Sequence, residues 1–97
     1  MVVGAVNQFV MPYVIAVYDV GQKRVGKMLK LFRRYLTWVQ NSVFEGDLTV
    51  VQFKQLQHEA EALLDEGDGV VFYQLRDERY SERTAIGTDK AQRGRFL

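Results

Sequence analysis

The segment Tyr13–Val20 reads YVIAVYDV and decides the fold. Its first six residues are β-branched, aromatic or small, which is the composition of a buried strand. Asp19 ends this apolar run, and basic residues follow it within a few positions. It is also the only acidic residue between Met1 and Phe44. Asp19 is therefore either a simple turn residue or the centre of a functional site.

The regions after this strand show clear periodic patterns. Trp38–Phe44 indicates two short strands with a bend near Asn41. Thr49 and Gln52 fit a capping box, which predicts the start of a second helix, and Val70–Leu75 reads as another strand. Between the first strand and Trp38, a helix is predicted from apolar residues that recur on one face, namely Val25, Met28, Leu29, Phe32, Tyr35 and Leu36.

This order of elements, β-α-β-β-α-β, predicts an α+β fold of the ferredoxin-like type, with one antiparallel sheet and two helices on one face. Residues 11–76 form the expected core. Residues 1–10 are interpreted as an N-terminal extension that is not native, with an ordered extra strand as the alternative. Residues 77–97 are expected to hold a linker, a short strand at Thr84–Gly87 and a basic tail that serves dimerisation.

Composition narrows the classes of function. The chain has 97 residues, of which 47% are apolar, as expected for one small domain. It has no cysteine, which excludes disulfides and thiolate metal sites and fits a cytoplasmic protein. Its single histidine, His58, excludes a multi-histidine metal cage. No apolar stretch reaches the roughly 20 residues that span a bilayer, so no membrane partner is expected.

Charge is distributed unevenly, although the formal net charge is only +1. Positions 23–34 hold six basic residues and no acidic one. Four of them fall within an arc of about 60° on the predicted helix. They form a basic stripe of Lys23, Lys27, Lys30 and Arg34. Such a stripe is either a solvated face or a surface for a phosphate backbone, and the absence of acids favours nucleic acid.

The chemistry open to Asp19 depends on association. A lone carboxylate does not hold Mg²⁺ tightly, because the ion is bound by several oxygens. A two-fold dimer would pair two copies of Asp19, and such a pair could hold a metal ion for attack on a phosphodiester. The residues alone favour the simpler interpretation, in which Asp19 makes hydrogen bonds in a turn. Four aromatic residues could stack on bases but are more typical of a core or a dimer interface: Tyr18, Trp38, Phe44 and Tyr73.

Several motifs together resemble a known family. They are Tyr13–Val20, Lys23–Val25, Val39–Gly46, Asp68–Tyr73 and Ile86–Gly87. In this order and spacing they resemble the small CRISPR-associated adaptation proteins, the second of the two universal adaptation proteins. The resemblance extends over residues 11–87.

The resemblance implies a homodimer whose C-terminal strand joins the partner's sheet. It implies an endonuclease that depends on Mg²⁺ or Mn²⁺ and cuts RNA or DNA. It also implies a subunit of the integrase complex that captures foreign DNA as spacers in antiviral defence. Asp19 matches the family's metal-binding aspartate, and positions linked to activity in some members are matched by Tyr18, Arg24 and Phe44.

Two departures remove positive charge near this site. Trp38 and Gln22 stand where some members of the family carry arginine, which weakens the case for strong nuclease activity. Two alternatives therefore remain. One is a non-catalytic dimeric adaptor that binds DNA through the basic stripe and the neighbouring Arg24, and that docks the integrase. The other is a toxin-type endoribonuclease of the same fold.

Overall fold

The computed structural model describes residues 12–77 and 80–89. The predicted extension at residues 1–10 and the predicted basic tail beyond residue 89 lie outside the described residues. The elements are β1 (Tyr13–Asp19), α1 (Gln22–Arg33), β2 (Thr37–Gln40), β3 (Val43–Asp47), α2 (Val50–Leu63), β4 (Gly69–Asp77) and β5 (Tyr80–Gly87).

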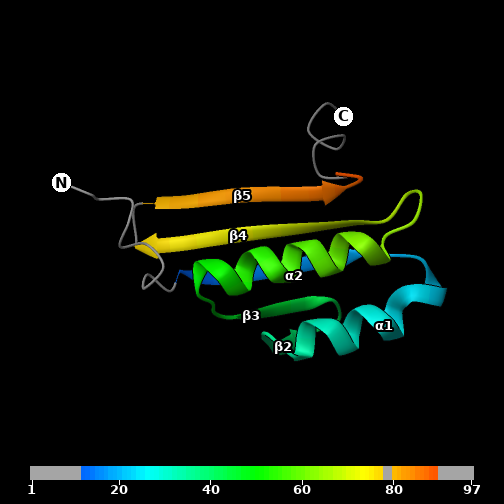
Figure 1. Ribbon diagram of the computed structural model, residues 1–97, viewed down its shortest axis with the longest axis horizontal. Helices are drawn as coiled ribbons and strands as arrows, with labels where there is room; N and C mark the ends of the chain where they lie inside the picture. Colours follow the sequence, from blue (N-terminus) through cyan, green and yellow to red (C-terminus); the bar gives the residue numbers. More distant parts are fainter. Residues whose placement is uncertain (1–11, 78–79, 90–97) are drawn as a thin grey trace.

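The strands form one antiparallel sheet in the order β2-β3-β1-β4-β5. Both helices lie on the same side of this sheet (Figure 1). The α+β, ferredoxin-like class that the sequence predicts is confirmed. The bend predicted near Asn41 is the β2–β3 turn, where Asn41 adopts a φ of 46°.

The core lies between the sheet and the helices. Side chains alternate along β1, so Val14, Ala16 and Tyr18 are buried beneath the helices while the residues between them face the opposite side. Phe32 of α1 packs on Phe72 of β4 with the ring centroids 6.0 Å apart. Buried aromatic pairs of this kind stabilise a fold by more than the burial of their apolar area alone. The other face of the sheet carries no helix, so its residues are only partly covered.

The start of α2 and the end of α1 are set by different local interactions. The predicted capping box of α2 is confirmed, because Thr49 Oγ1 accepts a hydrogen bond from Gln52 N at 3.0 Å and Thr49 N donates to Gln52 Oε1 at 2.9 Å. α1 ends at Arg33, earlier than its apolar pattern suggests. Leu36 is still buried, because the tight turn after the helix folds it into the core.

The C-terminal part differs most from the sequence prediction. Most of the expected linker is strand, since β4 runs to Asp77 and β5 begins at Tyr80. The polar and charged residues of this hairpin have the composition of a linker, and one pair, Gln74 and Glu82, is joined by a 3.0 Å hydrogen bond across the strands. In this one chain β5 pairs with its own β4, whereas the resemblance places the C-terminal strand in a partner's sheet.

Candidate functional site

Asp19 is the last residue of β1 and lies opposite Gly69 of β4 in the sheet register. Its side chain is exposed. An open pocket of about 330 Å³ lies beside it, lined by Tyr18, Asp19, Val20, Val25, Asn41 and Ser42. The pocket thus joins the end of β1, the first turns of α1 and the β2–β3 turn. A strand end that opens on a pocket is a suitable place for a carboxylate that binds a ligand.

Two of the predicted site residues are aromatic and belong to the core beneath this pocket. Tyr18 is 5% exposed and lines the pocket, whereas Phe44 is fully buried. Their rings stack with the centroids 6.0 Å apart. Burial raises the pKa of the Tyr18 hydroxyl, and the charge of Arg33 partly opposes that shift. These aromatic residues support the site from below, and the hydroxyl of Tyr18 stays protonated near neutral pH.

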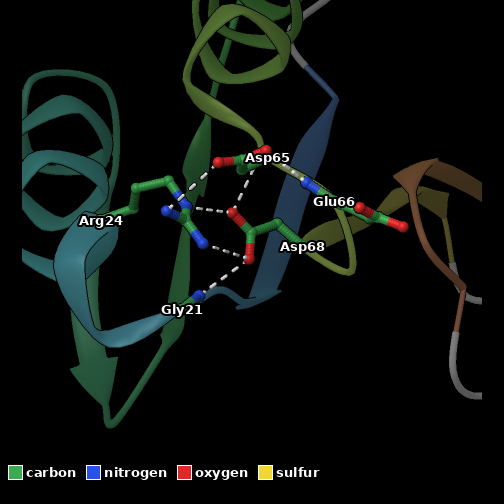
Figure 2. A network of polar contacts seen from close by, with 5 residues as sticks. All are labelled: Gly21, Arg24, Asp65, Glu66 and Asp68. Atoms are coloured by element: carbon green, nitrogen blue, oxygen red, sulfur yellow. Dashed lines mark hydrogen bonds and ion pairs between the residues drawn. The ribbon is translucent and has the colours of Figure 1, made fainter.

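Arg24, the remaining predicted site residue, is engaged elsewhere. Its guanidinium binds the buried carboxylate of Asp68 through Nε and through Nη2, the latter at 3.2 Å (Figure 2). Nη1 lies 3.7 Å from Asp65 as well. The structure therefore brings Arg24 together with two aspartates of the α2–β4 loop.

Asp68 is the residue that the sequence prediction missed. It is 4% exposed, and its carboxylate also accepts hydrogen bonds from Gly21 N at 2.8 Å and from Asp65 N at 3.0 Å. The bond from Arg24 is the main reason that the pKa of Asp68 falls to about 2, and it raises the pKa of Arg24. This network holds three segments together, namely the turn after Asp19, the first turn of α1 and the loop before β4.

Close backbone packing surrounds the same loop. A Cβ atom at Gly69 would clash with the carbonyl oxygen of Thr88, and one at Gly87 would clash with that of Asp68. Gly87 also has a φ of +78°, which side chains rarely tolerate. The sequence signal for this close packing is an aspartate between two glycines, Gly67 and Gly69, at the start of a strand.

The basic stripe is exposed along its length, but its two ends differ. Lys23, Lys27 and Lys30 are exposed. At the other end, Arg34 lies 3.3 Å from Glu59 of α2. Tyr35 also binds Glu59, and this bond is the first cause of the lowered pKa of that carboxyl. Arg34 also faces solvent, but Glu59 partly neutralises its charge, so the three lysines are the main cations of the stripe.

The four aromatic residues that could stack on bases fall into a buried pair and an exposed pair. Tyr18 and Phe44 lie in the core, as predicted. Trp38 is 48% exposed on the edge strand β2, and Tyr73 is 36% exposed on the face of the sheet without helices. Over the described part of the chain, no cluster of three or more metal-ligating side chains occurs, and Asp19 is the carboxylate among the residues that line the pocket. None of the described helices is long and apolar enough to cross a bilayer.

Comparison with known proteins assigns the chain to a family. A family model described as CRISPR associated protein Cas2 matches residues 11–83. The chain belongs to the Cas2 family. This confirms the resemblance drawn from the motifs and favours that family over the toxin-type alternative.

Individual relatives agree over nearly the whole chain. The CRISPR-associated endoribonuclease Cas2 of Dictyoglomus turgidum is 46% identical, covering 88% of this chain and 99% of the relative. The protein of the same name from Thermotoga maritima is 45% identical over 84% of this chain and 95% of the relative. A crystal structure of Cas2 has a TM-score of 0.68 at 38% identity, covering 84% of this chain and 92% of that one. The Cas2 structure from Streptococcus pyogenes has a TM-score of 0.51 at 26% identity, covering 86% and 93%.

The buried carboxylate of Asp68 predicts a specific pH dependence of stability. Its pKa in the folded chain is depressed, so its contribution is complete above the pKa of an unfolded aspartate, near 4, and disappears as pH falls towards 2. We expect Asp68→Asn to lower the free energy of unfolding at neutral pH and to flatten its decline between about pH 5 and 2. Urea denaturation across this range measures both effects. Asp47→Asn, at an exposed carboxylate, is the control, and parallel curves for Asp68→Asn and wild type would contradict the assignment.

Proposed function

We propose that this protein is a cytoplasmic endonuclease of the CRISPR adaptation machinery that hydrolyses phosphodiester bonds with Mg²⁺ or Mn²⁺. The single observation that carries the proposal is Asp19, a carboxylate held at a strand end beside an open pocket. Relatives that share up to 46% identity with the chain are named endoribonucleases, so RNA is the first substrate to test. Double-stranded DNA is the second.

A second copy of the chain is part of this proposal. The face of the sheet opposite the helices has an apolar centre, in which Val17 is flanked by Val43 and Val71 in the register. These three side chains are only half-buried in one chain. A two-fold axis would place this face against itself, so that every apolar residue meets another apolar surface. The neighbouring row runs from Glu45 to Arg83, so a copy turned by 180° about an axis parallel to β1 sets Glu45 opposite Arg83, whose guanidinium also binds Asp89.

Asp19 lies on this same face of the sheet, opposite the helices. Side chains alternate along β1, so Asp19 points to the side of Val17 and away from the helix-covered core. Association of two chains through this face about an axis along β1 would therefore bring the two copies of Asp19 towards that axis. Two carboxylates with water and phosphate oxygens are a donor set that suits Mg²⁺. The bound ion would stabilise the charge that develops on the phosphate group during attack by water.

The other residues have supporting roles in this proposal. Arg24 binds Asp68, which in turn holds the turn after Asp19 in place. In this proposal the guanidinium of Arg24 does not contact the phosphate. Tyr18 lines the pocket, and the buried ring of Phe44 packs against Tyr18 from the core. The exposed cations Lys23, Lys27 and Lys30 attract the phosphate backbone on either side of the cut.

A second function is favoured by the same basic stripe. Because one chain supplies one pocket carboxylate and Arg24 is committed to Asp68, the dimer could act as a non-catalytic adaptor. It would bind duplex DNA along the lysines and dock the integrase subunits. Under this alternative, spacer acquisition would not require Asp19.

Removal of the pocket carboxylate separates the two functions. We expect Asp19→Asn to abolish detectable cleavage of labelled single-stranded RNA and double-stranded DNA in Mg²⁺ or Mn²⁺, because the ion loses its protein ligands. EDTA should do the same to wild type. Asp47→Asn is the matched control, since it removes an exposed carboxylate at another strand end. Cleavage by Asp19→Asn at the wild-type rate would exclude the proposed site, and no cleavage by any protein would favour the adaptor.

The proposed dimer face makes its own prediction. Val17→Lys places a charge at the apolar centre of that face, so we expect the dimer to dissociate in sedimentation equilibrium and metal-dependent cleavage to fall with it. Val51→Lys, at a side chain of α2 that is 55% exposed, is the control and should remain dimeric. Circular dichroism shows whether each variant is folded. A folded Val17→Lys variant that still dimerises would refute this interface.

The basic stripe is tested by charge reversal. Lys23→Glu combined with Lys27→Glu should weaken binding of nucleic acid of any sequence and should reduce the slope of log affinity against log salt by about 1 for each lost phosphate contact. Lys54→Glu, at an exposed position of α2, is the control for reversal of a lysine outside the stripe, and it is compared with Lys23→Glu alone, which changes the net charge by the same amount. If the double variant and the control behave alike in fluorescence anisotropy, the stripe is only a solvated face.

A further inference from the structure

Trp38 is an exposed aromatic residue beside the pocket, and the proposed function gives it no role. It lies on the edge strand β2, and 48% of it is exposed. Its partner across the ladder is Phe44, whose buried ring faces the helices. Trp38 therefore lies on the helix-covered side of the sheet but beyond the limit of the core. The indole of Trp38 therefore offers an open aromatic surface to a ligand.

The ring is held in place by its neighbours. Its Nε1 donates a 2.8 Å hydrogen bond to the carbonyl oxygen of Asn41. The guanidinium carbon of Arg33 lies 5.9 Å from the ring centroid, a cation–π arrangement. The polar edge of the indole is thus satisfied, and its orientation is fixed from two sides. A ring fixed in this way loses little conformational entropy when a flat ligand stacks on it.

The same contacts connect Trp38 to the Asp19 pocket. Asn41, which accepts the indole hydrogen bond, lines that pocket with Ser42 and Asp19. Arg33 is also close enough to Tyr18, another lining residue, for its charge to oppose the rise in the pKa of that hydroxyl. An aromatic surface and a cation therefore lie along one side of the proposed site.

We propose that Trp38 stacks on an unpaired base of single-stranded RNA while the neighbouring phosphate lies at the Asp19 pocket. This inference rests on the proposed function and adds a residue that contacts a base of the substrate. Indole and base faces attract each other irrespective of sequence, and Arg33 adds a cation beside the phosphate chain. In a duplex the faces of the bases are already covered by their neighbours, so only an unpaired base can use the ring. Trp38 thereby selects single strands over duplexes.

The experiment uses the indole as its own probe, because Trp38 is the only tryptophan of the chain. The wild-type protein is titrated in EDTA, which prevents metal-dependent cleavage, with a short single-stranded oligoribonucleotide of mixed sequence. We expect saturable quenching of the tryptophan fluorescence. An abasic strand of the same length and charge, and a blunt duplex, should bind with little quenching.

Substitutions then measure what the ring contributes to affinity. Trp38→Leu should weaken binding of the single strand roughly 5- to 100-fold and leave duplex binding unchanged, and Trp38→Phe should restore part of the loss. Val39→Thr is the matched control, since Val39 is an exposed apolar neighbour on the same strand. Binding is followed by anisotropy of a labelled oligonucleotide, which does not depend on the tryptophan.

The outcomes separate this inference from the function on which it rests. Equal affinity of Trp38→Leu and wild type for the single strand, or equal quenching by the abasic strand, overturns base stacking while leaving Asp19-dependent cleavage standing. Loss of dimerisation in Trp38→Leu with unchanged RNA affinity also overturns it and assigns the ring to a protein interface. Selective quenching and a selective loss of affinity support it even if no cleavage is found.

Discussion

The position of Asp19 depends on a second aspartate that never reaches the pocket. Asp68 is 4% exposed, and a buried carboxylate is costly unless hydrogen bonds and a countercharge replace its water. Two backbone N–H groups and the guanidinium of Arg24 supply them. Because these donors come from the turn after β1, the loop after α2 and the first turn of α1, one carboxylate fixes where the three segments meet. The strand end that carries Asp19 is held by this arrangement and by its pairing with Gly69.

This arrangement changes how the cations around the site are understood. An arginine in the first turn of a helix beside a candidate phosphate site reads naturally as a phosphate ligand. Here the Arg24 side chain is used to neutralise Asp68, and its donors are directed into the fold. The exposed lysines of α1 and Arg33 remain to attract an anionic substrate. Positioning and electrostatic attraction are therefore assigned to different basic residues of the same helix.

How far the sequence could predict this structure depends on the distance over which each feature is determined. The strand at Tyr13–Tyr18 and the cap at Thr49 were predicted because their signals lie within a few residues. Asp68 was missed because its partners, Gly21 and Arg24, lie 47 and 44 residues away in the chain. Locally, an aspartate between two glycines is simply a turn. The strands at Val70–Leu75 and Thr84–Gly87 were predicted, but the length of the β4–β5 hairpin was missed for a related reason, since its polar residues resemble a linker until the ladder pairs them.

The period of two along β1 links the parts of the proposed mechanism. Even-numbered residues of the strand fill the core, and Tyr18 is the last of them. Odd-numbered residues lie on the face without helices, and Asp19 is the last of these. A slip of one residue in register would bury Asp19 and expose Tyr18, so the pairing that stabilises the core also decides where the carboxylate points. Association of two chains through that face then places Asp19 at or near their interface. The geometry of one strand thus connects folding, the proposed dimer and the proposed metal site.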